Sequence, residues 1–263
     1  MANGFDVIAT DPAANAEAKL RKYVDTASPD LTALGFDKDG SREKLSFTPD
    51  PKNALGNADF VQENGPEKKD FKVQLSADMG AATSPDSIIA SSSSGLTMSV
   101  MQSACKRPER CVIGHPFNPP HMVSSVEMVG GAKTSAEVVR RAIDFYASLG
   151  KKPIHLRKEV LGHVANRLQA AIYREVENLI NLGVVDVADA DAAVCWKDLG
   201  SFTEWPEGSK ETIAADVIKA ANGRSVDELA QMRDAVLVER VKLRVEQVEE
   251  STPALAKWDG SYA

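Results

Sequence analysis

The sequence predicts an α/β fold, with a doubly wound sheet in the first part of the chain and an all-helical C-terminal part. Up to Leu156, short apolar runs such as Ile88-Ile89 and Val112-Ile113 alternate with longer amphipathic stretches. This alternation is typical of βαβ units around a mostly parallel sheet, whose strands are covered on both faces. After Leu156 apolar residues recur every three or four positions, which is typical of helices.

The expected strands are Asp6–Thr10, Phe60–Gln62, Ser87–Ala90, Cys111–Gly114, Val126–Val129 and Pro153–Leu156. The helices expected between them are Ala13–Val24, Pro66–Met79, Thr97–Ala104 and Ser135–Leu149. Ser135 is a suitable N-cap for the last of these helices, and Gly150 follows it as a C′ residue.

The helices expected in the C-terminal part are Val164–Leu182, Val187–Cys195, Ser209–Ala221 and Ser225–Val248. Gly183 ends the first helix, and Asp186 is a suitable N-cap for the second. We therefore divide the chain into an α/β domain, residues 1–158, and a helical C-terminal domain, residues 159–263.

The composition is that of a globular protein, with 43% hydrophobic residues among 263. A net charge of −7 argues against a nucleic-acid partner, which usually requires a basic surface. The three cysteines and four histidines lack the spacing of a metal site, and we expect no metal. No secretory signal or membrane span is expected, so the cytosol is the predicted compartment.

The start of the sequence departs from a complete doubly wound domain. Such a domain opens with a strand, a glycine-rich turn and a helix that hold the pyrophosphate of a dinucleotide. This chain opens on Asn3-Gly4-Phe5-Asp6, which is typical of the turn and strand after that helix, and it contains no GxGxxG. We therefore expect an incomplete Rossmann-like sheet that lacks its first strand and glycine loop.

Four motifs between Ile89 and Arg167 carry a family resemblance. They are Ile-Ala-Ser-Ser-Ser-Ser-Gly-Leu at 89–96, Gly-His-Pro-Phe-Asn-Pro-Pro at 114–120, Val126-Glu127, and Gly-His-Val-Ala-Asn-Arg at 162–167. Together, at these separations, they resemble the 3-hydroxyacyl-CoA dehydrogenase family. The serine run and His115-Pro116 are most similar to its λ-crystallin, L-gulonate and carnitine dehydrogenase branch.

The resemblance implies an NAD-dependent oxidoreductase that transfers a hydride between NAD and a 3-hydroxy acid or its coenzyme A thioester. In this interpretation His115 is the general base, Glu127 orients it, and Ser94 and Asn166 bind the substrate oxygen. Elementary chemistry agrees, because histidine is suited to take a hydroxyl proton near neutral pH. A carboxylate on its other ring nitrogen fixes the tautomer and stabilises the imidazolium.

Each of these residues also has a structural interpretation. The prolines beside His115 are typical of turns, Glu127 suits a solvated strand end, Asn166 suits a helix and Ser94 suits a helix N-cap. The structural interpretation is the preferred one for the other histidines, His121, His155 and His163.

The resemblance also implies contacts to NAD. Asp11 ends an expected strand, where a carboxylate binds the ribose hydroxyls and repels a 2′-phosphate, which favours NAD over NADP. The alternative is that Asp11 caps a helix beginning at Pro12. Glu67 and Lys72 match positions on the nicotinamide side, and Ser92 and Asn118 are further expected contacts.

Departures from the family leave a second function open. Cys195-Trp196 joins directly to Lys197-Asp198, where the family continues with a Gly-Pro-rich segment, and Leu161 replaces a usual proline. The alternative is a catalytically inactive relative or truncated product with a binding or structural role. A 6-phosphogluconate-type dehydrogenase is disfavoured, because Val164–Leu182 lacks the lysine that such proteins use. As partners, the family resemblance implies a small-molecule substrate and a second copy of the chain in a homodimer.

Overall fold

A computed structural model describes residues 1–35 and 40–194. The chain divides into two compact units. Within the described residues, the first unit contains 1–35, 40–54 and 117–124, and the second contains 55–116 and 125–194. The helices expected at 209–221 and 225–248 lie outside the described residues, and the expected domain boundary near residue 158 stays a prediction.

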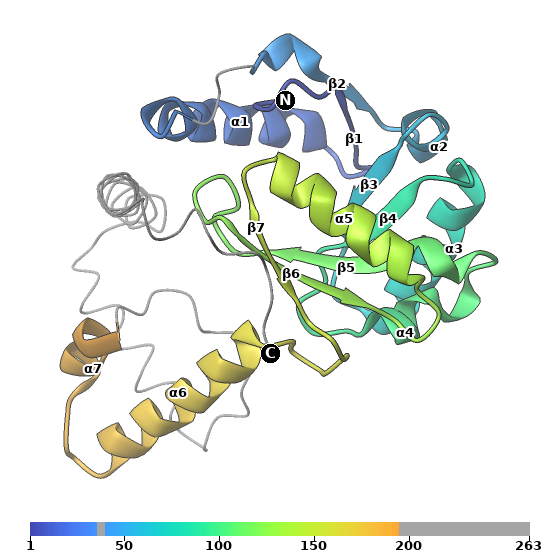
Figure 1. Ribbon diagram of the computed structural model, residues 1–263. Coiled ribbons are helices and arrows are strands. Elements are labelled where there is room, and N and C mark those ends of the chain that lie inside the picture. Colours follow the sequence, from blue (N-terminus) through green and yellow to red (C-terminus); the bar gives the residue numbers. More distant parts are fainter. Residues whose placement is uncertain (36–39, 195–263) are drawn as a thin grey trace, which may run out of the picture. The chain divides into compact units, whose positions relative to one another are not determined.

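The first unit contains a small parallel sheet and a long helix (Figure 1). Strand β1 (Val7–Thr10) pairs in parallel with β2 (Leu45–Thr48). Between them lie helix α1 (Ala16–Ala33) and a 3-10 turn at Arg42–Lys44, and α2 (Pro51–Leu55) ends at the boundary with the second unit.

Helix α1 is longer than the sequence predicts, since it ends at Ala33 and not at Val24. It continues through Pro29, which lacks an N–H for the helix ladder. The hydroxyls of Ser28 and Thr32 each donate to a carbonyl one turn earlier, at 2.6 and 3.0 Å. These side-chain bonds flank the proline and help to keep the helix continuous there.

The second unit is built on a five-stranded sheet in the order β3-β4-β5-β6-β7 (Figure 1). The first three strands, β3 (Phe60–Glu63), β4 (Ile88–Ser91) and β5 (Cys111–Pro116), are parallel. Strand β6 (Ser125–Gly130) runs antiparallel to β5, and β7 (Lys152–His155) is parallel to β6. The predicted α/β class is therefore confirmed, and each of the expected strands is present to within two residues at either end.

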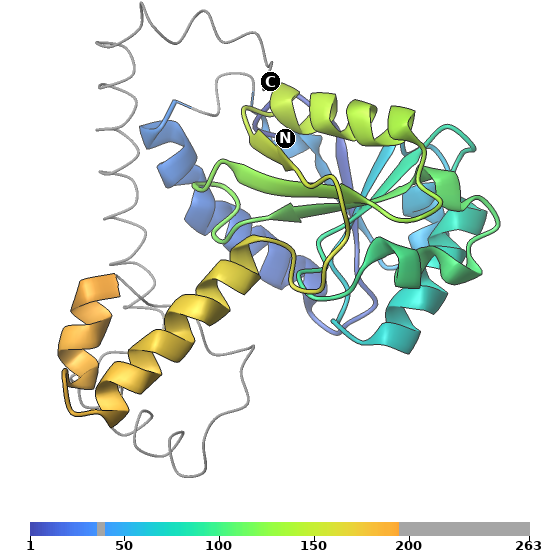
Figure 2. The same cartoon turned by 60° about the horizontal axis from the view of Figure 1, so that its bottom comes forward.

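Helices cover both faces of this sheet (Figure 2). Alternate strand residues such as Ile89 and Ile113 pack with Met79 of α3 (Lys69–Ala82) and Met98 of α4 (Met98–Met101). The intervening residues pack against α5 (Ala136–Ser148); they include Ile88, Ala90, Val112 and Met128. Strands covered on both faces need apolar residues at every position, as the sequence pattern predicted.

Two of the predicted helix caps are confirmed. The Ser135 hydroxyl accepts from the Val138 N–H at 3.1 Å at the start of α5. The Asp186 carboxylate accepts from the Asp189 N–H at 2.8 Å at the start of α7 (Val187–Val194). Helix α6 (Ala165–Asn181) lies within its expected range. Among the described residues, no helix is both long and apolar enough to span a bilayer.

The structure contradicts two of the alternative cap assignments. Helix α4 has Thr97 at its N-cap position. The Ser99 N–H, in its first turn, donates to the Glu159 carboxylate. Ser94 therefore does not cap this helix. Helix α1 begins at Ala16 after Asn15, so Asp11 does not cap it either. The Asp11 carboxylate instead accepts from the Ala13 N–H at 2.8 Å within a turn.

Candidate active site

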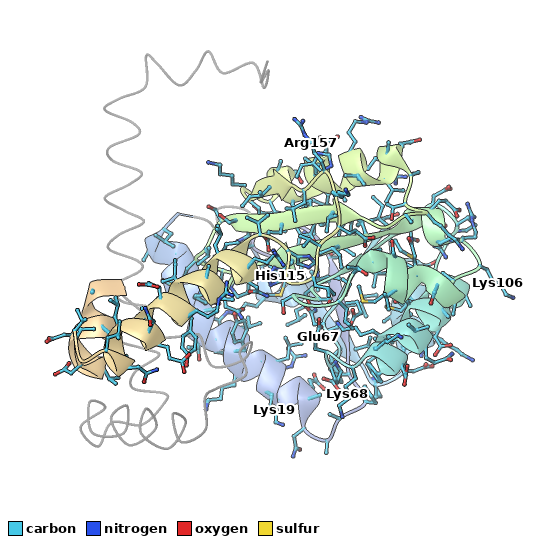
Figure 3. All side chains as sticks on the ribbon, turned by 90° about the horizontal axis from the view of Figure 1, so that it is seen from below. Lys19, Glu67, Lys68, Lys106, His115 and Arg157 are labelled. Carbon is cyan, nitrogen blue, oxygen red and sulfur yellow. The ribbon has the colours of Figure 1, made fainter. Side chains whose placement is uncertain are left out.

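The antiparallel ladder between β5 and β6 brings His115 and Glu127 together. The two residues are direct cross-strand partners, so their side chains project from the same face of the sheet. His115 Nδ1 lies 2.9 Å from Glu127 Oε2. A carboxylate only accepts hydrogen bonds, so Nδ1 carries the proton and Nε2 of a neutral ring keeps its lone pair. Figure 3 shows His115 beside the first turn of α6.

The second oxygen of Glu127 binds the start of α6. Its Oε1 accepts from the backbone N–H groups of Val164 and Ala165, both at 2.9 Å. Burial alone raises the pKa of the Glu127 carboxyl, but the hydrogen bonds from His115, Ala165 and Val164 outweigh it and lower the pKa overall. Glu127 is therefore held as a carboxylate facing His115, with a helix N-terminus behind it.

The other two predicted catalytic residues lie on neighbouring segments of the same unit. The Asn166 side chain donates from Nδ2 to the Ser94 carbonyl at 3.0 Å. The Gly162 N–H lies 3.4 Å from the Gly95 carbonyl, which adds a second link between the two segments. The structure thus joins the loop after β4, residues 92–97 (the serine loop), to the residues that anchor Glu127. Ser94 and Asn166 remain the predicted oxygen-binding groups.

Glu67 organises the serine loop. Its Oε1 accepts from the Gly95 and Leu96 N–H groups at 2.9 and 3.0 Å, and from the Ser93 hydroxyl. Burial raises the pKa of the Glu67 carboxyl, but the hydrogen bond from Ser93 and the backbone N–H bonds outweigh it, with a smaller contribution from the Lys72 charge. The result is a pKa below the ordinary value, so Glu67 is a fixed negative charge at this loop.

A buried ion pair that sequence reasoning missed lies beneath this loop. The Lys72 ammonium donates to both oxygens of Glu63, at 3.0 and 2.9 Å, and the two side chains are only 1% and 2% exposed. Glu63 also accepts from the Ser91 hydroxyl and the Gly65 N–H, while its carbonyl accepts from Ser92. The signal in the sequence was the position of Glu63 directly after the expected strand Phe60–Gln62; in the structure it is the last residue of β3, opposite Ser91 of β4.

We predict that Lys72→Met destabilises the protein by about 3–5 kcal/mol, because it leaves the Glu63 carboxylate buried without its cation. The free energy of unfolding in urea measures the effect. Lys68→Met, at the exposed lysine just before α3, is the matched control and is expected to stay near wild type. The double variant E63Q/K72M is expected to be more stable than K72M, since no unpaired charge remains. A K72M protein as stable as wild type contradicts the account.

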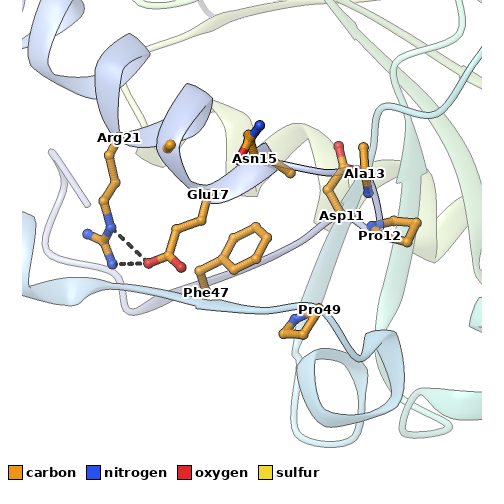
Figure 4. A pocket seen from close by; sticks show the side chains of 10 residues that line it. Asp11, Pro12, Ala13, Asn15, Glu17, Arg21, Phe47 and Pro49 are labelled. Carbon is orange, nitrogen blue, oxygen red and sulfur yellow. Dashed lines mark hydrogen bonds and ion pairs between the residues drawn. The ribbon is translucent and has the colours of Figure 1, made fainter.

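The remaining predicted cofactor residues lie in the first unit. Asp11 follows β1 at the carboxyl end of the small parallel sheet and lines an open pocket of about 500 Å³ (Figure 4). Phe47 and Pro49 line the same pocket from β2 and the residues after it, and the Arg21–Glu17 pair borders it from α1. Asn118 is exposed in the 117–124 segment of this unit.

The fold and these side chains define a class of protein, a nucleotide-binding α/β protein with a histidine–carboxylate pair at a strand end. Residues 1–160 match the family model described as 3-hydroxyacyl-CoA dehydrogenase, NAD binding domain. The chain belongs to the 3-hydroxyacyl-CoA dehydrogenase family, in its carnitine dehydrogenase-like branch. The match to an NAD binding domain confirms NAD as the cofactor expected from the sequence.

Individual relatives agree with this assignment. L-Carnitine dehydrogenase of Pseudomonas aeruginosa is 44% identical, over 77% of this chain and 65% of the relative. The enzyme of the same name from Streptomyces coelicolor is 38% identical, over 91% of this chain and 87% of the relative. One similar solved structure is that of 5-formyl-3-hydroxy-2-methylpyridine 4-carboxylic acid 5-dehydrogenase, an NAD+-dependent dismutase. Its TM-score to this chain is 0.69 and its sequence identity is 30%, over 88% of this chain and 72% of that chain. The chain thus spans slightly less than two thirds of the Pseudomonas relative's length.

The residues of the first unit fit the adenosine half of NAD. A carboxylate at the carboxyl end of a parallel strand is the group that this class of fold offers to ribose hydroxyls, and Asp11 occupies that position. Phe47 and Pro49 add flat apolar surface to the same pocket. This donor set suits a nucleoside without a 2′-phosphate, because a second negative charge beside Asp11 is unfavourable.

Proposed function

We propose that this protein oxidises the hydroxyl group of a small, free 3-hydroxy acid with NAD as its cofactor. The observation that carries the proposal is the His115–Glu127 hydrogen bond of 2.9 Å, with Glu127 anchored by two backbone N–H groups. The family and the names of the relatives support an alcohol as substrate, and L-carnitine is the first compound to test.

His115 is proposed to accept the hydroxyl proton at Nε2, because Nδ1 already donates to Glu127. The ring becomes an imidazolium, and the Glu127 carboxylate stabilises that charge without taking the proton. General-base catalysis of this kind contributes about 10²- to 10⁴-fold to a rate. In the reverse direction the same imidazolium returns the proton to the carbonyl oxygen.

Ser94 and Asn166 are proposed to bind the substrate oxygen. They lie on two segments that are already bonded to each other, so little ordering is needed when substrate binds. Donors held at the position where negative charge develops stabilise a transition state more than they stabilise the substrate. Their effect on the rate is therefore expected in kcat as well as in KM.

Bound NAD supplies the acceptor for the hydride that leaves the substrate carbon. In the chain itself, Asp11 is proposed to hold the adenosine ribose, and Glu67, Ser92 and Asn118 to lie toward the nicotinamide. Lys72 is proposed to act at a distance, by fixing Glu63 and the loop that carries Ser92. The reducing cytosol is the compartment in which we propose that the reaction occurs.

The experiment is an absorbance assay for NADH with the purified chain, NAD and three alcohols: L-carnitine, 3-hydroxybutyrate and 3-hydroxybutyryl-CoA. Turnover of a free acid with little activity on the thioester supports the proposal. Turnover of the thioester alone replaces the substrate class with acyl-CoA. A folded chain that binds NADH and turns over none of the three refutes the proposal and favours a non-catalytic binding role.

A further inference from the structure

His163 is buried between the serine loop and the His115–Glu127 pair. Its side chain is among the fully buried ones, with 1% relative exposure. Its Nε2 lies 2.9 Å from the Ser93 carbonyl oxygen, and its ring centroid lies 5.7 Å from that of His115. The next two residues, Val164 and Ala165, donate their N–H groups to Glu127. One short segment therefore contacts both the loop and the catalytic pair.

The tautomer of His163 follows from its partner. A carbonyl oxygen only accepts, so Nε2 of His163 carries a proton and donates it. Among the described residues, Nδ1 is buried and has no hydrogen-bond partner. The bond from Nε2 to Ser93 is therefore the polar contact that fixes the orientation of this ring.

The backbone at His163 is unusual in the same place. Gly162 and His163 have φ values of +74° and +49°, so two consecutive residues adopt left-handed conformations. A positive φ is uncommon for residues other than glycine, and residues held there occur mainly where the surroundings dictate the conformation. Here the turn directs the following N–H groups, those of Val164 and Ala165, to Glu127.

From these contacts we propose that His163 is a positioning residue for the His115–Glu127 pair. Its hydrogen bond to Ser93 fixes the left-handed turn at Gly162 and His163. This turn then holds the Val164 and Ala165 N–H groups, which anchor Glu127. Its ring also packs beside His115 and restricts the rotation of that side chain. The proposal rests on the proposed function only for its effect on turnover; the structural link can be tested without it.

Two substitutions separate the hydrogen bond from the bulk of the side chain. His163→Phe keeps an aromatic ring but has no donor for the Ser93 carbonyl. His163→Gln places an amide Nε2 at a comparable reach and keeps a donor. His155→Phe, at an exposed histidine on β7, is the matched control. Urea unfolding of each variant records any general loss of stability.

The first measurement needs no activity. In ¹⁵N NMR of the wild type, His163 is expected as the Nε2–H tautomer, and His115 is expected to show a slowly exchanging Nδ1–H bonded to Glu127. His163→Gln keeps the His115 signal, whereas His163→Phe loses it through faster exchange. A His163 protonated at Nδ1 in the wild type overturns the proposal, even if His163→Phe fails to fold.

The second measurement is kinetic. His163→Phe is expected to lower kcat by about 10²-fold with little change in KM, because the base is misplaced but the substrate still binds. His163→Gln is expected to retain most of the rate. Equal losses in both variants, or no loss in His163→Phe, overturn the proposal. A wild type without turnover refutes the proposed function instead, and the NMR results still decide the role of His163.

Discussion

Replacing His115 with glutamine is expected to lower kcat for the proposed oxidation by about 10²- to 10⁴-fold. Glutamine is similar in length and polar, but its amide cannot take a proton from an alcohol near neutral pH. The environment of His115 is set by the ladder between β5 and β6 and by the start of α6. Steady-state kinetics together with an NADH fluorescence titration measure the two effects separately.

The expected pattern for His115→Gln is a large loss of kcat with unchanged NADH affinity. His155→Gln, at the exposed histidine on β7, is the control for the loss of a histidine as such. A His115→Gln protein that keeps its rate removes His115 from the mechanism. Loss of NADH binding in parallel with the rate indicates instead that His115 supports the fold of the cofactor site.

Replacing Glu127 with glutamine is expected to lower kcat by about 10²- to 10⁴-fold, although the side chain keeps its shape. An amide oxygen still accepts from the Val164 and Ala165 N–H groups, but the negative charge that stabilises the His115 imidazolium is gone. When the new amide NH₂ faces His115, it donates to Nδ1. This favours the tautomer of His115 that carries its proton on Nε2, which cannot act as the base. KM is expected to change little, because the lost interaction is strongest in the transition state.

The Glu127 substitution also carries a pH signature. In the folded protein the pKa of the Glu127 carboxyl is lower than its usual value of about 4.3. A group with a lowered folded-state pKa contributes stability above its unfolded pKa and loses it as the pH falls through the folded value. Wild type is therefore expected to exceed E127Q in stability at neutral pH, with the difference shrinking below about pH 4.3. Glu175→Gln, at an exposed position of α6, is the control; a pH-independent difference contradicts this account.

The His115–Glu127 pair could be predicted because both residues lie in motifs whose separation resembles that of the family. The antiparallel ladder that places them opposite each other was not predicted, since the sequence pattern indicated a mostly parallel sheet. The strands of the second unit could be predicted from their local composition. Runs such as Ile88-Ile89 and Val112-Ile113 are apolar at every position, and only a sheet covered on both faces buries them fully.

Other features depend on contacts distant in the sequence and could not be predicted. Lys72 resembled a cofactor contact, but its helix α3 turns the side chain inward to Glu63, nine residues earlier. Strand β2 was missed because Leu-Ser-Phe-Thr is a short, half-polar run, which forms a strand here by pairing with β1. The division into two sheets, in contrast, agrees with the missing first strand, because that strand is central in the doubly wound order 3-2-1-4-5-6. His163 was set aside because a lone histidine is usually structural, and only its three-dimensional neighbours distinguish it.

The most direct test of the central claim is transfer of label from substrate to cofactor. The purified chain is incubated with NAD and the proposed hydroxy acid carrying deuterium at its hydroxyl-bearing carbon, and the NADH is analysed by mass spectrometry. The account predicts NADH that carries one deuterium, formed by wild type and nearly abolished in His115→Gln. Unlabelled NADH, or no NADH from a folded chain that binds the cofactor, contradicts it.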